Sequence, residues 1–212
     1  MFIHEMFQQK PCVFSVEVFP PKKAGAAEET LYPVLRELCT LGPDYISVTY
    51  GAGGGTAGQS TAKIASYIKN GLHVEALAHL TCVNSTRVQV EETLTRLRED
   101  NVENVLALRG DINPDLPRRM DFLALYVFDF VGFHRHPGSL HHRRMDFLHA
   151  SDLAKAIAQT GGFGVAGACY PEGHMESPSL KADVESLRYK AEAGVSHLIT
   201  QLFFDNVSYY RL

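Results

Sequence analysis

Glu17 and the triplet Arg109-Gly110-Asp111 are the residues whose types and surroundings point most directly to chemistry. Glu17 lies within the apolar run 14–19, where a carboxylate is costly unless it is paired or protonated. Burial raises the pKa of a carboxyl group, which suits a general acid. The triplet follows the apolar run 105–108, which is typical of a strand buried on both faces. A turn at Gly110 would then expose the Arg109 cation and the Asp111 carboxylate together. The ordinary alternatives are an outward-facing Glu on an edge strand and a surface ion pair.

Other short apolar runs also end in polar side chains. These are Thr49-Tyr50, His79, Tyr170 with His174, and Gln201. If the strands are parallel, their carboxyl ends meet at one rim, the usual place of an active site in parallel α/β folds. Together with Glu17 and the triplet, they predict a site at that rim.

The glycine-rich segment 51–60 permits two phosphate-binding interpretations, and both are weak. A P-loop requires Lys where Gln59 stands. Gly53, Gly55 and Gly58 fit the dinucleotide pattern, but the acid expected at the end of the next strand is missing, since Glu75 lies at its start. A flexible segment that lets a ligand approach the backbone closely is the simpler interpretation.

The elements that must position these residues recur regularly. Strands are predicted at 14–19, 45–50, 75–80, 105–108, 164–168 and 197–203, and helices at 28–41, 61–70, after Ser85, after Ser151 and at 180–193. The first four strands start 31, 30 and 30 residues apart, the length of one strand–helix unit. Such units build either a (β/α)₈ barrel or a doubly wound sheet. Six are visible here, and eight would require two more.

A repeated hexapeptide interrupts this rhythm. Arg-Arg-Met-Asp-Phe-Leu occurs at 118–123 and again at 143–148. About 25 residues, 119–143, are therefore predicted to be an insertion in the loop after the fourth strand. Its histidines lack an acidic or cysteine partner at metal-ligand spacing, so a solvated loop is favoured over a metal site. They are His134, His136, His141 and His142.

Composition excludes several classes of function. A net charge of −4 without a long basic run argues against nucleic acid as a partner. No signal peptide is evident, and the longest apolar stretch, 122–133, is too short to span a membrane. The four cysteines are scattered and lie in or near apolar segments, as in a cytoplasmic protein with reduced thiols and no metal site. The sequence does not decide whether the chain forms a homo-oligomer.

Six blocks of sequence together resemble the methylenetetrahydrofolate reductase family, in that family's order and over nearly the whole chain apart from the insertion. They are Phe-Ser-Val-Glu-Val-Phe-Pro-Pro-Lys at 14–22, Ser-Val-Thr-Tyr-Gly-Ala-Gly-Gly at 47–54, His-Leu-Thr-Cys at 79–82, Leu-Ala-Leu-Arg-Gly-Asp at 106–111, Tyr-Pro-Glu-Gly-His at 170–174 and Thr-Gln-Leu-Phe-Phe-Asp at 200–205.

The resemblance implies a (β/α)₈ TIM barrel, present over residues 1–212 as a single incomplete catalytic domain of about six βα units. It implies non-covalent FAD, which passes a hydride from NADH or NADPH to 5,10-methylenetetrahydrofolate and so yields 5-methyltetrahydrofolate. This reaction belongs to one-carbon metabolism and methionine supply. The folate and the nicotinamide nucleotide are the implied partners.

The same resemblance assigns roles to residues. Glu17 would be the general acid that helps to open the five-membered ring of the folate. Asp111 would tune charge beside the flavin and pterin, and Gln201 would hydrogen-bond the pterin or the nicotinamide. The implied flavin contacts are Thr49, Tyr50, His79, Leu108, Arg109, Gly110, Asp111, Ala150, Tyr170, His174, Asp183 and Lys190.

Several features depart from the family pattern. His149, Ser186 and Tyr189 stand where the family usually carries other residues, and the insertion falls in a loop expected near the flavin. The last two strand units of the family are missing, so we expect unpaired strand edges, aggregation and poor activity of this chain alone. The alternatives are a non-functional remnant of such an enzyme and a different TIM-barrel lyase that binds a phosphate at 51–60.

Overall fold

A computed structural model describes residues 1–21, 23, 25–50, 57–83, 85–110 and 146–212. Predictions about Asp111, the insertion 119–143 and most of the glycine segment lie outside these residues. The described chain alternates strands and helices in this order: α1 (Ile3–Gln9), β1 (Ser15–Val18), α2 (Ala27–Cys39), β2 (Tyr45–Val48), α3 (Ala57–Ser66), the π-helix η2 (Tyr67–Gly71), β3 (Glu75–Thr81), α4 (Arg87–Glu99), β4 (Asn104–Leu108), α6 (Ala150–Thr160), β5 (Gly164–Cys169), α7 (Leu180–Glu192), β6 (His197–Thr200) and α8 (Asn206–Tyr210).

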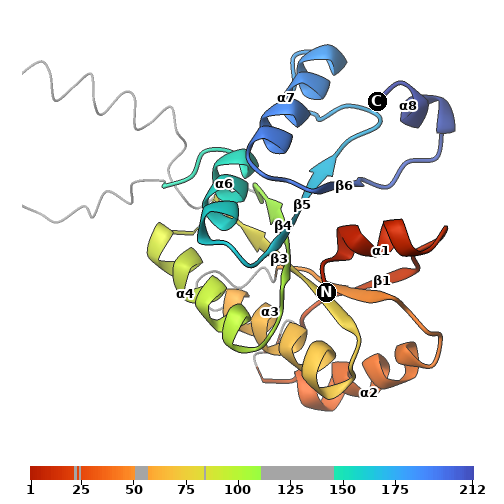
Figure 1. Ribbon diagram of the computed structural model, residues 1–212, viewed down its shortest axis with the longest axis vertical. Helices are drawn as coiled ribbons and strands as arrows, with labels where there is room; N and C mark the ends of the chain where they lie inside the picture. Colours follow the sequence, from red (N-terminus) through yellow and green to blue (C-terminus); the bar gives the residue numbers. More distant parts are fainter. Residues whose placement is uncertain (22, 24, 51–56, 84, 111–145) are drawn as a thin grey trace, which may run out of the picture.

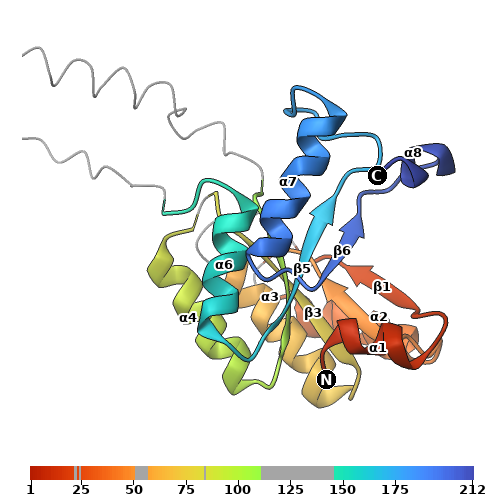
Figure 2. The same cartoon turned by 45° about the horizontal axis from the view of Figure 1, so that its top comes forward.

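The strands form one parallel sheet in the order β1-β2-β3-β4-β5-β6. Each strand therefore pairs with the next one along the chain, whereas a doubly wound sheet reverses its strand order at a switch point. The sheet curls, with most helices on its convex side (Figures 1 and 2). The predicted barrel architecture with about six βα units is confirmed, as an open arc in which β1 and β6 are the edges of the described sheet.

The larger core lies between the convex face and the helices α2, α3, α4 and α6. Alternate strand residues point outward into it, as the two-residue period of a strand requires. Ile46, Val48, Leu80 and Val105 are among those that are almost fully buried there. This core fixes the backbone on which the polar ends of the strands are mounted.

A second, smaller core fills the concave face. Tyr45, Leu77 and Leu106 from the strands pack there with Ile3 and Met6 from α1. Helix α1 thus lies against the inside of the sheet, and it was not predicted.

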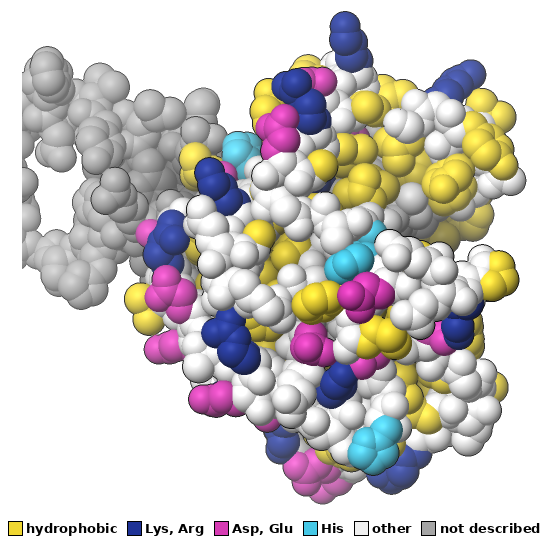
Figure 3. All heavy atoms as spheres, viewed as in Figure 1, with side chains coloured by type: hydrophobic (Ala, Val, Ile, Leu, Met, Phe, Trp, Pro, Cys, Tyr) yellow, Lys and Arg dark blue, Asp and Glu magenta, His cyan; other side chains and the backbone are white. Residues whose placement is uncertain are grey.

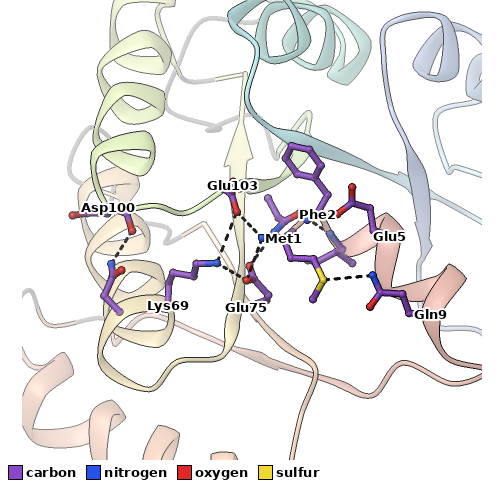
Figure 4. Close-up of polar contacts among 11 residues, drawn as sticks. Met1, Phe2, Glu5, Gln9, Lys69, Glu75, Asp100 and Glu103 are labelled. Atoms are coloured by element: carbon purple, nitrogen blue, oxygen red, sulfur yellow. Dashed lines mark hydrogen bonds and ion pairs between the residues drawn. The ribbon is translucent and has the colours of Figure 1, made fainter.

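Polar contacts around Met1 hold α1 in this place (Figure 4). The fully buried amide of Asn104 accepts a hydrogen bond from the Ile3 N–H at 2.9 Å and donates one to the Met1 carbonyl at 3.1 Å. The Met1 amino group lies 2.6 Å from a carboxylate oxygen of Glu103, and Lys69 pairs with Glu75 beside it. These contacts stabilise the amino end of the sheet, opposite the predicted site.

The predicted strands agree with the observed ones to within a few residues, but some helix boundaries were wrong. Helix α4 is capped by Thr86, whose hydroxyl accepts the Gln89 N–H, and not by Ser85. The segment predicted as one helix from 61 to 70 is α3 followed by η2. The last strand, β6, ends at Thr200 because the chain then turns toward α8.

Apolar side chains are exposed beyond β6. Leu202, Phe204 and Tyr210 are at least 73% exposed, and Figure 3 shows hydrophobic side chains gathered on this side of the molecule. They lie near the open edge of the arc.

Candidate functional site

A groove of about 680 Å³ opens at the carboxyl ends of β4 and β5, between α6 and α7. Seven of the residues predicted to contact a cofactor line it: Leu108, Arg109, Ala150, Tyr170, His174, Asp183 and Lys190. They come from the end of β4, the helices α6 and α7, and the loop after β5. The structure therefore brings together in one hollow side chains that are up to 82 positions apart in the sequence.

Arg109 and Gly110 form a tightly held corner on one side of the groove. The Arg109 carbonyl accepts the backbone N–H groups of Cys82 and Val83, at 3.2 and 3.0 Å. Gly110 has φ +80°, and a Cβ there would lie 2.9 Å from Thr81 Cβ, so only glycine fits this turn. The Arg109 guanidinium pairs with Glu176 across the groove, and this hydrogen bond raises the Arg109 pKa. The cation is therefore held in place and permanently charged.

The loop after β5 is fixed by Asp183 of α7. Asp183 is only 7% exposed, and its carboxylate accepts the His174 N–H at 2.9 Å. Tyr170 and His174 meet edge to face, with ring centroids 4.7 Å apart. Asp183 thus shapes the wall of the groove by holding the backbone that carries both rings.

Lys190 places a second cation on the floor of the groove. Its Nζ donates a hydrogen bond to the Ala168 carbonyl at 2.5 Å. Burial lowers the Lys190 pKa, while the charges of Asp183 and Cys169 act in the opposite direction. An ammonium group in this position is poorly hydrated and would gain from an anionic ligand.

Glu17, Ser47 and His79 lie together on the concave face, on three neighbouring strands. His79 Nε2 is 2.6 Å from Ser47 Oγ and 3.5 Å from Glu17 Oε2. His79 and Ser47 are both only 6% exposed, and burial lowers the His79 pKa to about 4. The Glu17 side chain is 49% exposed because β1 is an edge strand, yet partial burial still raises its pKa. Glu17 is thus more open to solvent than its apolar neighbours in the sequence indicated.

The remaining predicted residues lie apart from the groove. Thr49 follows β2, and its N–H donates to the Val18 carbonyl. Tyr50 also follows β2, and its side chain lies beside Gly58 of α3, in a small separate hollow between α3 and α4. Gln201 is exposed just after β6, and its N–H donates to the Cys169 carbonyl at 2.8 Å. Asp111 itself lies outside the described residues.

Sequence reasoning missed two partners of predicted residues. Ser47 shares the inward face of β2 with Tyr45, so the two-residue period of the strand could have identified it. Glu176, the partner of Arg109, carries no comparable signal because it lies in an irregular loop.

The described ranges contain neither a metal-ligand cluster nor a helix suited to cross a membrane. No group of three or more His, Cys, Asp or Glu side chains is placed there to hold a metal ion. None of the helices in these ranges has the length and apolar character that a membrane crossing requires.

Comparison with known families decides the relationship. A family model described as methylenetetrahydrofolate reductase matches residues 2–212. The chain belongs to the methylenetetrahydrofolate reductase family.

Curated members of the methylenetetrahydrofolate reductase family include bacterial and plant relatives. The chain is 34% identical to 5,10-methylenetetrahydrofolate reductase of Pectobacterium carotovorum subsp. carotovorum, over 93% of this chain and 56% of that protein. It is 34% identical to methylenetetrahydrofolate reductase (NADH) 1 of Arabidopsis thaliana, over 96% of this chain and 32% of that protein. The chain thus spans about half the length of the bacterial relative and a third of the plant one.

Solved structures of more distant proteins share the fold of this family member. An uncharacterized protein from Clostridium thermocellum that binds two copies of 5-methyl-5,6,7,8-tetrahydrofolic acid superposes with a TM-score of 0.59 at 15% identity, over 97% of this chain and 59% of that one. A 2,3-dimethylmalate lyase also superposes with a TM-score of 0.59, at 12% identity, over 100% of this chain and 66% of that one. At such identities the likeness concerns the fold alone.

Proposed function

We propose that this chain carries the flavin- and folate-binding part of a methylenetetrahydrofolate reductase. The reaction is the reduction of 5,10-methylenetetrahydrofolate to 5-methyltetrahydrofolate by NADH or NADPH through bound FAD. Its product would supply the methyl group used in methionine synthesis. Family membership supports this proposal, and the observation that carries it is the single groove that collects seven of the predicted cofactor contacts.

The chemistry of the groove fits FAD. Arg109, Lys190 and His174 offer cationic or hydrogen-bonding groups for a pyrophosphate, and Tyr170 and Leu108 offer flat or apolar surface for rings. When bound, FAD supplies the hydride chemistry, which amino-acid side chains do not provide. The protein supplies binding, orientation and charge.

In this proposal Arg109 and Lys190 bind the cofactor, and Glu17 donates a proton to the folate. Arg109 is held by Glu176, and Lys190 by the Ala168 carbonyl, so little side-chain freedom is lost when an anion binds. Glu17 would protonate a nitrogen of the folate and so help to open its five-membered ring. Its raised pKa favours the protonated form that this step needs, and its exposed side chain can regain a proton from water.

Two further assignments complete the proposed site. Asp111, which follows the Arg109-Gly110 corner, would tune charge near the reacting rings, and Gln201 would hydrogen-bond the pterin or the nicotinamide. Thr49, His79 and Gly110 remain proposed flavin contacts.

Flavin binding and the two half-reactions test the proposal. The purified protein should bind FAD with a visible flavin absorbance band. NADH or NADPH should bleach that band without oxygen, and 5,10-methylenetetrahydrofolate should restore it. Absence of FAD binding, or a reduced flavin that the folate does not reoxidise, would contradict the proposed function.

A further inference from the structure

The contact between Ser47 and His79 has a direction. The distance of 2.6 Å from Ser47 Oγ to His79 Nε2 is shorter than the roughly 2.7–3.2 Å of N–H···O bonds and lies in the range of bonds donated by a hydroxyl. The distance favours an arrangement in which the serine hydroxyl is the donor and Nε2 is the acceptor. Because a neutral imidazole carries one proton, that proton then resides on Nδ1.

The direction of this hydrogen bond determines whether Glu17 faces a protonated or an unprotonated nitrogen of His79. His79 Nε2 also lies 3.5 Å from Glu17 Oε2, so an unprotonated nitrogen faces the carboxyl group. A lone pair repels a carboxylate and tolerates a carboxylic acid, whereas an N–H at the same place would favour the carboxylate. Among the described residues, Glu17 is the one ionisable side chain with an ion-pair contact to His79.

We propose that Ser47 and His79 are positioning residues for Glu17: the Ser47 hydroxyl donates to His79 Nε2, fixes the tautomer protonated at Nδ1, and thereby keeps the Glu17 carboxyl protonated between turnovers. The inference rests on the proposed role of Glu17 as the acid and adds the means by which its proton is retained. Once Glu17 has given its proton to the folate nitrogen, the same lone pair disfavours the carboxylate and promotes its reprotonation from water.

Nitrogen NMR of the protein without cofactor tests the tautomer directly. With ¹⁵N-labelled histidine and the His79→Gln variant for assignment, we expect the signal pattern of Nδ1–H with an unprotonated Nε2 at neutral pH. The Nε2–H pattern would overturn the proposal. This readout does not depend on flavin, folate or turnover, so it separates failure of this inference from failure of the proposed function.

Substitutions at Ser47 test the link to Glu17. In Ser47→Ala the tautomer should become mixed, the Glu17 pKa followed by ¹³C NMR should fall, and folate reduction should slow about tenfold while flavin reduction by the nicotinamide changes less than about twofold. Ser47→Thr retains the hydroxyl and should retain the tautomer. Ser15→Ala, at an exposed position on the same face of β1, is the matched control and should alter none of these values. An unchanged Glu17 pKa in Ser47→Ala, or a Ser47→Thr protein that behaves like Ser47→Ala, would refute the link.

Discussion

At the scale of single residues, buried polar groups in the site act through fixed partners. Lys190 bonds the Ala168 carbonyl, and Asp183 accepts the His174 N–H. The family resemblance implied roles for Asp183 and Lys190 but did not predict these pairings, because a partner in an irregular loop or on a strand carbonyl leaves no periodic trace in the sequence.

Lys190 can be tested as a cofactor anchor. In Lys190→Met the buried cation is lost while the side-chain stem is retained, so we expect FAD affinity to fall about tenfold or more, the value of one charge-assisted hydrogen bond. A fluorescence titration with FAD measures this. Lys181→Met is the control, because Lys181 is exposed on the same helix and does not line the groove. Equal affinities of the two variants would remove Lys190 from the site.

At the scale of elements, strand order follows from the roughly 30-residue rhythm because each strand–helix unit packs beside the previous one. Helix faces are less predictable. In α2, helical spacing places Val34 and Leu35 on one apolar face. Leu35 is fully buried, but Val34 is 47% exposed, and Tyr32 is buried instead, with its ring stacked on that of Tyr67. This stacking is a tertiary contact that the period of a single helix does not encode.

The corner between β4 and the groove depends on Gly110. In Gly110→Ala both the positive φ and the contact with Thr81 oppose a Cβ, so we expect a loss of about 2–4 kcal/mol in unfolding free energy. Gly161→Ala is the matched control: its φ is +72° but its Cβ would meet nothing within 4 Å, so we expect the smaller loss of the two, about 1–3 kcal/mol from backbone conformation alone. Urea unfolding of both variants makes the comparison. A Gly110→Ala protein no less stable than Gly161→Ala would show that the corner is not tightly packed.

The described part of the second hexapeptide, residues 146–148, packs against the fold. Asp146 accepts the Arg87 N–H at 2.7 Å, and the Phe147 ring is 1% exposed with the Arg87 guanidinium 5.3 Å from its centre. Deleting 119–143 joins Arg118 to Arg144 and leaves one intact hexapeptide. The insertion interpretation stays a prediction, and this deletion tests it.

We expect the 119–143 deletion to unfold cooperatively with a melting temperature close to that of the parent, because the contacts of 146–147 are retained. Circular dichroism during heating measures this. Adding Phe147→Ala to the deletion should cost about 3–5 kcal/mol and serves as the control for docking of the hexapeptide. Failure of the simple deletion to fold would show that 119–143 belongs to the core structure.

At the scale of the whole molecule, a parallel arc places its chemistry at one end and its stabilising contacts at the other. The Met1 cluster closes the amino end of the sheet, while the groove and Glu17 lie toward the carboxyl ends. Polar residues at the ends of apolar runs predicted a site at the carboxyl ends of the strands, whereas nothing in the sequence predicted the Met1 cluster. It could not reveal α1, which is short and gains its stability from the concave face.

The pH dependence of the unfolding free energy tests whether buried His79 is neutral in the folded protein. Burial lowers the pKa of His79 to about 4 from an ordinary 6.5, so between these values the unfolded chain binds more protons than the folded one. The contribution of neutral His79 to the unfolding free energy is fully present above pH 6.5. It is lost as the pH falls toward 4, and the loss amounts to about 3 kcal/mol. Urea unfolding from pH 7 to pH 4.5 should therefore show a shallower loss in His79→Gln than in the parent. Identical slopes would contradict a neutral buried His79.

The most direct test of the account is Glu17→Gln, followed through the two half-reactions in a stopped-flow instrument. Glutamine keeps the size of the side chain but carries no acidic proton. We expect flavin reduction by NADH or NADPH to stay within about twofold, while reoxidation by 5,10-methylenetetrahydrofolate slows about 10²- to 10⁴-fold, the usual contribution of a general acid. Equal loss of both half-reactions, or full retention of the second, would contradict the assignment of Glu17 as the acid.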